Sequence, residues 1–314
     1  MTPFQPLFRN PHLQTIAGHL WRRPANGPVP LESRLYQTEP QVQVLVESQR
    51  PAARAAAGEI VLLHGLEGSG KSSCVRGMAA AALGQGFAVH RFHMRTCGGT
   101  ERLCSTLYHA GLTSDLLAVL RQFQTEGRAP VFLVGFSLGG NVALKLAGEL
   151  GGSAHPLLAG VAAVSAPIDL EASARRIGEP RNRLYERRFV RRMTARLCAT
   201  GRYRPADFAG LRTLWAIDDC ITAPSFSFGG AANYYKTQSS IRYLPGIRVP
   251  VLLIQAKDDT FIPFDAFESQ AVRSNPRIRL LAPEHGGHLG FLGRGEPRFW
   301  SEETVLRWIA EQKL

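Results

Sequence analysis

A serine lies between two glycines in the stretch Gly135-Phe136-Ser137-Leu138-Gly139. A serine hydroxyl can attack a carbonyl carbon when a neighbouring base removes its proton. An apolar run comes directly before this stretch and a helical pattern follows it, and this strand–turn–helix context is typical of a nucleophile elbow. The alternative is a glycine-rich turn with an incidental serine. The context favours Ser137 as a catalytic nucleophile.

The base and the acid that such a serine needs can be sought after the last two apolar runs, in "QAKDDTFIP" and "EHGGHLGF". We expect Asp259 to be the acid because it stands four residues before Pro263, whereas its rival Asp258 would cap the turn. His288 fits the base because it heads "HLGF", and His285 is expected in a second layer or at the surface. Two imidazoles without further ligands make a poor metal site, so we expect no metal and no cofactor.

Residues 64–72 read HGLEGSGKS, which also fits the G-x-x-x-x-G-K-S pattern of a phosphate-binding loop. In hydrolases with a nucleophile elbow, the loop after the third strand supplies one N–H to the developing oxyanion, and the residue after the nucleophile supplies another. We therefore expect the backbone N–H groups of Leu66 and Leu138 to form an oxyanion hole. A phosphate-binding loop also needs an acidic strand end that holds a metal, and no unassigned one is found, so nucleotide binding is disfavoured.

The elements around these residues alternate between strand and helix patterns from about residue 59. Apolar strands are predicted at 59–65, 87–94, 130–136, 157–167, 249–259 and 277–283. Helices are predicted at 74–86, 113–127, 138–150, 264–274 and 302–312. Such apolar strands between helices indicate an α/β fold, with a mostly parallel central sheet covered by helices on both faces. Residues 33–48 are expected to add an antiparallel hairpin at one edge.

A long interruption separates two of the strands, at about 169–247, and it ends in the aromatic run "FSFGGAANYY". A loop of this length should carry its own helices, and insertions there commonly cover the carboxyl edge of the sheet. We expect a helical cap in which Phe226 and Phe228 contact the substrate. The whole chain, 1–314, is read as one domain with an N-terminal extension at about 1–30.

The net charge is +12, and basic residues are dense from Ala174 to Arg196. That segment is either a solvated helical face or a surface attracted to an anionic membrane or an acidic substrate. No nucleic-acid-binding module accompanies it, so no nucleic acid is expected. The five cysteines form no C-x-x-C pair, and no signal peptide or membrane-spanning run is found. We therefore expect a cytoplasmic protein.

The chain resembles the hydrolase-4 branch of the α/β-hydrolases, the YheT-like hydrolases, over nearly its whole length. The resemblance rests on "NPHLQTI" (10–16), "HGLEGS" (64–69), "RTCGGTERLCSTLYHAGLTSDL" (95–116), "GFSLGGN" (135–141), "DDCITAPSFSFGGAANYY" (218–235), "AKDD" (256–259) and "HGGHLGF" (285–291). It implies that Ser137, Asp259 and His288 correspond to the charge-relay residues. The pair Tyr108-His109 also fits the branch, without an assigned role, whereas the lysine of "GSGKSS" departs from it.

The resemblance also implies a serine hydrolase acting on carboxylic esters, some relatives of which handle lipids or transfer acyl groups. We therefore expect a small-molecule or lipid-like ester as substrate, cleaved through an acyl-enzyme. Acyl transfer to an alcohol is the alternative within the same chemistry. A P-loop nucleotidase and a non-catalytic protein that binds anionic surfaces are the alternatives outside it.

Overall fold

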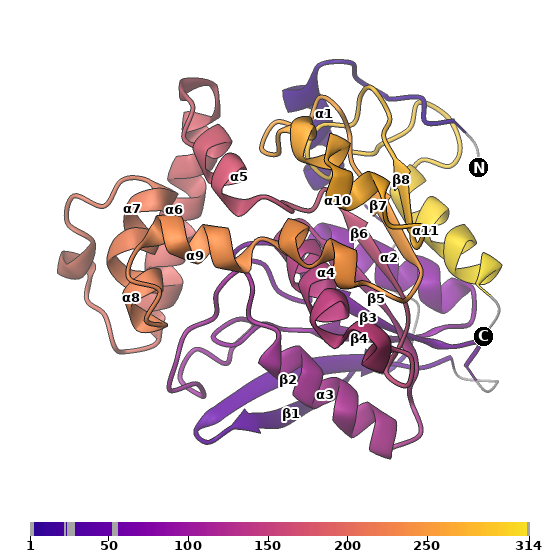
Figure 1. Cartoon of the computed structure of the whole chain (residues 1–314), viewed down its shortest axis with the longest axis horizontal. Coiled ribbons are helices and arrows are strands. Elements are labelled where there is room, and N and C mark those ends of the chain that lie inside the picture. Colours follow the sequence, from indigo (N-terminus) through magenta and orange to yellow (C-terminus); the bar gives the residue numbers. More distant parts are fainter. Residues whose placement is uncertain (1–2, 22, 24–28, 52–55, 313–314) are drawn as a thin grey trace.

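An eight-stranded sheet forms the centre of the computed structural model, which describes residues 3–21, 23, 29–51 and 56–312 (Figure 1). The strand order is β1-β2-β4-β3-β5-β6-β7-β8. The strands are β1 (Glu32–Glu39), β2 (Val42–Gln49), β3 (Glu59–Leu63), β4 (Ala88–Phe92), β5 (Val131–Phe136), β6 (Leu158–Val164), β7 (Val251–Ile254) and β8 (Ile278–Leu281). From β4 to β8 neighbouring strands are parallel, and β1 and β2 form an antiparallel hairpin at the edge. The predicted sheet and its edge hairpin are confirmed.

Helices cover both faces of this sheet because its central strands are apolar on both sides. In β3, Ile60 and Leu62 pack with α2 (Ser73–Gly84) and α11 (Trp300–Glu311). Val61 and Leu63 pack with α3 (Ser114–Thr125) and α4 (Leu138–Leu150) on the other face. The helices are α1 (Pro11–Leu20), α2 (Ser73–Gly84), α3 (Ser114–Thr125), α4 (Leu138–Leu150), α5 (Leu170–Ile177), α6 (Arg183–Ala199), α7 (Leu214–Ile217), α8 (Ala223–Ser225), α9 (Ala231–Gln238), α10 (Gln270–Arg273) and α11 (Trp300–Glu311).

One predicted helix differs from the structure. Residues 264–274 form a 3₁₀ turn, Phe264–Glu268, followed by the short α10. Ser269 separates them with an extended backbone, φ −64° and ψ 156°. The Ser269 hydroxyl makes no capping hydrogen bond, so the break between the two elements lies in its extended backbone.

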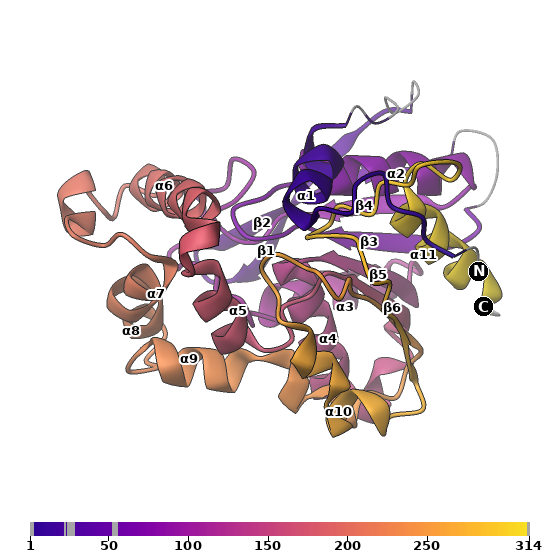
Figure 2. The ribbon, with the colours of Figure 1, turned by 90° about the horizontal axis from the view of Figure 1, so that it is seen from above.

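The segment 169–247 contains α5 to α9, which project from the sheet on one side (Figures 1 and 2). Asp169 begins α5, and its carboxylate accepts a hydrogen bond from the N–H of Ala172 at 3.0 Å. The segment has its own apolar cluster, in which residues of α6 and α7 pack against Leu107 and Phe208. No helix in the described ranges is both long and apolar enough to cross a membrane.

Helix α1 lies in the N-terminal extension. Pro11 opens it, and the Asn10 side chain accepts hydrogen bonds from the N–H groups of His12 and Leu13, both at 3.0 Å. Proline suits the first helical position because the N–H that it lacks would have no partner there. The helix buries Gln14, Thr15 and Gly18 against the loop after β8.

Candidate active site

Ser137 occupies the sharp turn between β5 and α4. Its φ of 51° and ψ of −124° lie in a region that costs free energy for any residue except glycine, and such strain concentrates at functional sites. The turn needs Gly135 and Gly139: a Cβ on either would lie within 2.6 Å of backbone atoms, of Gly139 itself in the first case and of His64 and Leu63 in the second. The turn therefore holds the Ser137 hydroxyl at the end of the strand.

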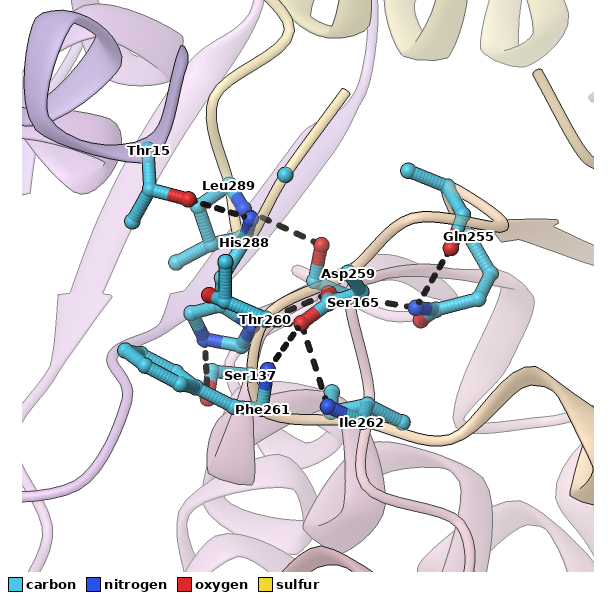
Figure 3. A network of polar contacts seen from close by, with 12 residues as sticks. Thr15, Ser137, Ser165, Gln255, Asp259, Thr260, Phe261, Ile262, His288 and Leu289 are labelled. Carbon is cyan, nitrogen blue, oxygen red and sulfur yellow. Dashed lines mark hydrogen bonds and ion pairs between the residues drawn. The ribbon is translucent and has the colours of Figure 1, made fainter. Parts of the chain in front are cut away.

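Ser137, His288 and Asp259 form a continuous chain of hydrogen bonds (Figure 3). The Ser137 Oγ lies 3.0 Å from His288 Nε2, and His288 Nδ1 lies 3.1 Å from both carboxylate oxygens of Asp259. With Nδ1–H donating to the carboxylate, Nε2 is the free acceptor of the ring. The geometry can therefore move a proton from the serine hydroxyl to His288.

The Asp259 carboxylate is fully buried, and each oxygen has further donors. The N–H groups of Phe261 and Ile262 donate to Oδ1 at 2.8 and 3.1 Å. The Gln255 amide donates to Oδ2 at 3.1 Å. These bonds fix the orientation of the carboxylate in front of His288.

The rival residues form a separate pair. Asp258 Oδ2 lies 3.1 Å from His285 Nδ1, and Asp258 Oδ1 accepts the N–H of Gly287 at 2.9 Å. No hydrogen bond in the described part of the chain joins either residue to Ser137. Asp259 and His288 are therefore the residues that lie beside Ser137. Asp258 instead forms hydrogen bonds with the loop that carries His288.

The loop after β3 lies against the serine. A Cβ on Gly65 would lie 3.1 Å from Ser137 Cβ and 3.7 Å from its Oγ. Leu66 and Leu138 line the same pocket as Ser137, and their N–H groups donate to no acceptor within the described residues. Two free N–H groups beside a serine hydroxyl can stabilise a developing oxyanion.

His64 holds that loop in place without titrating near neutral pH. Its Nδ1–H donates to the carbonyl of Gly65 at 2.8 Å, and its Nε2 accepts the N–H of Met94 at 3.1 Å. Complete burial lowers the pKa of His64 to about 3. The neutral ring thus acts as a fixed brace between the loop and the end of β4.

Four N–H groups in the lysine-containing part of HGLEGSGKS are bonded within the loop itself. Those of Gly68 and Ser72 donate to carbonyls within the loop at 2.9 and 3.0 Å. Those of Ser69 and Lys71 donate to serine hydroxyls within the loop at 3.1 and 3.2 Å. A phosphate-binding loop instead points such groups at its ligand.

Comparison with known proteins agrees with this fold. Residues 60–299 match the family described as "Alpha/beta hydrolase family". The chain belongs to the α/β-hydrolase family. It is 34% identical over 313 residues to YheT of Escherichia coli (strain K12), which covers 96% of this chain and 91% of that protein, and it belongs to the YheT-like branch.

Two further proteins are similar to this chain over most of its length. The chain is 29% identical over 265 residues to the monoacylglycerol lipase of Saccharomyces cerevisiae. The aligned region covers 80% of this chain but only 58% of the lipase. A crystal structure of the Pyrococcus furiosus esterase Pf2001 superposes with a TM-score of 0.63 at 17% identity, over 93% of this chain and 97% of the esterase. The second similarity is one of fold.

Sequence reasoning missed the residues that hold the His288 loop. The Thr15 hydroxyl accepts the N–H of His288 at 2.9 Å and donates to the carbonyl of Pro11 at 2.6 Å. The Gln14 amide donates to the carbonyls of Gly290 and Leu292, both at 2.8 Å. The motif "NPHLQTI" was the available signal: its helix α1 supplies the partners that an irregular loop needs.

A pocket lies between the sheet and segment 169–247 and reaches both Ser137 and His288. Its apolar lining comes from the core of the hydrolase and from that segment: Leu66, Leu138, Pro167, Leu170, Ile177, Phe189, Met193, Leu214, Phe261 and Ile262. Its polar lining includes Tyr108, His109, Asp218, Thr222, Tyr234 and Tyr235. A mostly apolar pocket with a few polar groups is typical of a small-molecule site.

Two expected pocket residues lie outside this lining. The rings of Phe226 and Phe228 pack against the ring of His109, with centroids 4.5 and 5.2 Å apart. His109 itself lines the pocket, and burial, together with the charges of Lys145 and Arg95, lowers its pKa to about 3. That both phenylalanines contact the substrate stays a prediction, and their rings pack on residues that line the pocket.

Asp218 is the buried carboxyl group of the pocket. It begins a π-helical turn, Asp218–Thr222, and accepts the hydroxyl of Tyr235 at 2.7 Å. Burial raises the pKa of Asp218 to about 6, although the hydroxyls of Tyr235 and Thr222 oppose the shift. Within the described ranges, no cluster of three or more histidine, cysteine or acidic residues could hold a metal ion.

Proposed function

We propose that this hydrolase cleaves carboxylic esters through an acyl-enzyme on Ser137. The observation that carries the proposal is the distance of 3.0 Å between Ser137 Oγ and His288 Nε2, in a ring whose other nitrogen faces the Asp259 carboxylate. The free N–H groups of Leu66 and Leu138 support it, because an acyl-transfer intermediate needs oxyanion donors.

In the first half of the proposed reaction, His288 Nε2 takes the hydroxyl proton as Ser137 Oγ bonds to the ester carbonyl carbon. The carbonyl oxygen becomes an oxyanion that the N–H groups of Leu66 and Leu138 bind. The bond from carbon to the alcohol oxygen then breaks, and His288 returns its proton to the departing alcohol. Asp259 keeps His288 in the required tautomer and stabilises the imidazolium.

In the second half, water enters where the alcohol left. His288 takes a proton from the water as its oxygen bonds to the acyl carbon. The bond between that carbon and Ser137 Oγ then breaks, the serine regains its proton and the carboxylic acid leaves. An alcohol in place of water gives a new ester by the same steps, so acyl transfer is the alternative outcome.

A lipid-like ester fits the proposal best. The lining of the pocket is mostly apolar, and apolar surface favours an alkyl or acyl chain. The name of one similar protein, a monoacylglycerol lipase, points to the same class of substrate. The chain spans little more than half of the lipase, so the activity of that whole protein serves only as a guide.

A fluorophosphonate label followed by peptide mapping tests the nucleophile. We expect one adduct, on the peptide that contains Ser137, and no adduct in Ser137→Ala. A label on another serine of the folded protein would contradict the proposal. A p-nitrophenyl ester series of increasing acyl length, with and without added ethanol, then separates hydrolysis from acyl transfer.

A further inference from the structure

Helix α1 exposes its apolar side. Leu13, Ile16 and Leu20 recur at a helical spacing and are 52%, 44% and 72% exposed, and Trp21 follows at 43%. The buried side of the helix carries Gln14, Thr15 and Gly18 instead. A surface helix normally shows the opposite arrangement. The hydrogen bonds from Gln14 and Thr15 to the His288 loop explain why these polar residues are buried. They do not explain why the exposed side of α1 is apolar.

Helix α6 exposes a basic stripe. Four exposed residues share one face of this helix by their spacing: Leu184, Arg187, Arg188 and Arg191. Of these, Leu184 is 79% exposed. In the part of the chain that the structure describes, none of these three arginines forms an ion pair with a carboxylate. Their charges are therefore available to an external partner.

The two helices lie side by side. The ring of His12 stacks on that of Tyr185 with centroids 5.8 Å apart, and Arg188 Nη2 lies 3.3 Å from His19 Nε2. Burial lowers the pKa of His19, and the charges of Arg188, Arg192 and Arg23 lower it further. Figure 2 shows α1 and α6 on the same side of the molecule. The apolar stripe and the basic stripe thus form one surface.

This surface adjoins the pocket. The ring of Tyr185 packs on Phe261 at 4.8 Å, and Phe261 packs on His288 at 4.6 Å. Phe189, on the same helix as Tyr185, lines the pocket. A partner that covers α1 and α6 would therefore lie close to the catalytic histidine.

We propose that this surface docks on an anionic lipid bilayer. We call it the α1–α6 face, and it comprises Leu13, Ile16, Leu20 and Trp21 with Leu184, Arg187, Arg188 and Arg191. Exposed leucines, an isoleucine and a tryptophan can enter the interfacial region of a bilayer, while arginines bind its phosphates. Charge complementarity selects an anionic surface, and a nucleic acid would leave the apolar stripe in water. The proposed ester hydrolysis gives the docking a purpose but is not needed for it.

Flotation with vesicles tests the α1–α6 face independently of catalysis when it is performed on Ser137→Ala protein. We expect binding to phosphatidylcholine vesicles that contain phosphatidylglycerol and weak binding to phosphatidylcholine alone. Ile16→Gln with Leu20→Gln, or Arg187→Gln with Arg191→Gln, should each lower the partition coefficient about tenfold or more. The matched control is Leu35→Gln with Arg121→Gln, an exposed pair on β1 and α3, which Figure 1 draws at the bottom of the molecule, away from α1 at the top.

Brominated lipid supplies a second measurement. Vesicles that contain it should quench the tryptophan fluorescence of the parent protein. The quenching should be much smaller in Trp21→Phe. The proposal would be overturned if all variants bound the vesicles equally. It would also be overturned if binding were the same with and without phosphatidylglycerol. Reversible self-association that Ile16→Gln with Leu20→Gln abolishes would overturn it as well, because a second copy would then be the partner. Circular dichroism shows that each variant is folded before it is compared.

Discussion

The Glu67 carboxylate and the Arg196 guanidinium form a buried ion pair that joins the loop after β3 to helix α6. Arg196 Nε lies 2.9 Å from both oxygens of Glu67, and the side chains are only 8% and 3% exposed. The Tyr108 hydroxyl accepts the N–H of Glu67 and donates to its carboxylate, both at 3.1 Å. Arg192 donates to the Glu67 carbonyl at 2.7 Å. The residue after Leu66 is thus held at its N–H, its carbonyl and its side chain.

Glu67→Gln should therefore lower kcat more than it changes KM. The substitution leaves Arg196 buried without its charge partner and loosens the backbone beside the Leu66 N–H. Loss of an oxyanion donor costs about 10²–10³ in kcat, so partial misplacement should cost at least about tenfold. Steady-state kinetics and the rate of fluorophosphonate labelling measure the effect. Arg187→Ala, an exposed change on the same helix, serves as the control. A lower melting temperature with normal kcat would reduce the pair to a structural role.

Asp259→Asn should lose about 10⁴ in kcat while remaining folded, because the amide favours the wrong tautomer of His288. Asp258→Asn should keep activity within about tenfold, because its oxygen can still accept the N–H of Gly287. The same ester assay compares the two variants. The reverse order of activities would mean that His288 is oriented by the other aspartate.

Thr15→Val removes the acceptor for the N–H of His288 while keeping the shape of the side chain. A buried donor without a partner costs about 1–3 kcal/mol, and part of that cost should appear as a loss of kcat of about tenfold. KM should change little. Thr15→Ser should restore activity, and Thr125→Val on α3 is the control. Full activity in Thr15→Val would exclude α1 from positioning His288.

Acyl-chain selectivity should respond to residues that line the pocket. Leu214→Trp should narrow the space between α7 and the sheet and move the optimum of the p-nitrophenyl ester series to shorter chains. Phe226→Ala and Phe228→Ala should shift it less, because both rings pack behind residues that line the pocket, His109 for both and Tyr234 for Phe228. A larger shift in either phenylalanine variant than in Leu214→Trp would support the direct substrate contact that the sequence predicted.

Lys71→Ala should keep ester hydrolysis within about tenfold of the parent protein, a barrier change under about 1.4 kcal/mol. The side chain of Lys71 is exposed, and the N–H groups of Ser69 and Lys71 are bonded within the loop. No Mg²⁺-dependent ATP hydrolysis is expected. Such hydrolysis, if it survived Ser137→Ala but vanished with Lys71→Ala, would overturn the proposed function.

Local patterns were enough to predict the strands that carry the site. The apolar runs before Ser137 and Asp259 become the buried strands β5 and β7, because a strand covered on both faces must be apolar throughout. The run before His288 becomes the half-buried edge strand β8. Parallel strands present their carboxyl ends at one edge of the sheet, so the three residues that follow them could be expected to lie together.

The sequence by itself determined the sheet, the sharp turn at Ser137 and the choice of side chains that could do chemistry there. Only the tertiary structure decided which residues surround them. Thr15 contacts His288 from 273 positions away in the sequence, Glu67 contacts Arg196 from 129 positions away, and the ring of Phe226 packs on that of His109. The spacing of apolar residues and the residue types in turns depend on interactions between residues close in the sequence. Contacts between residues far apart in the sequence depend instead on how whole helices and strands pack together.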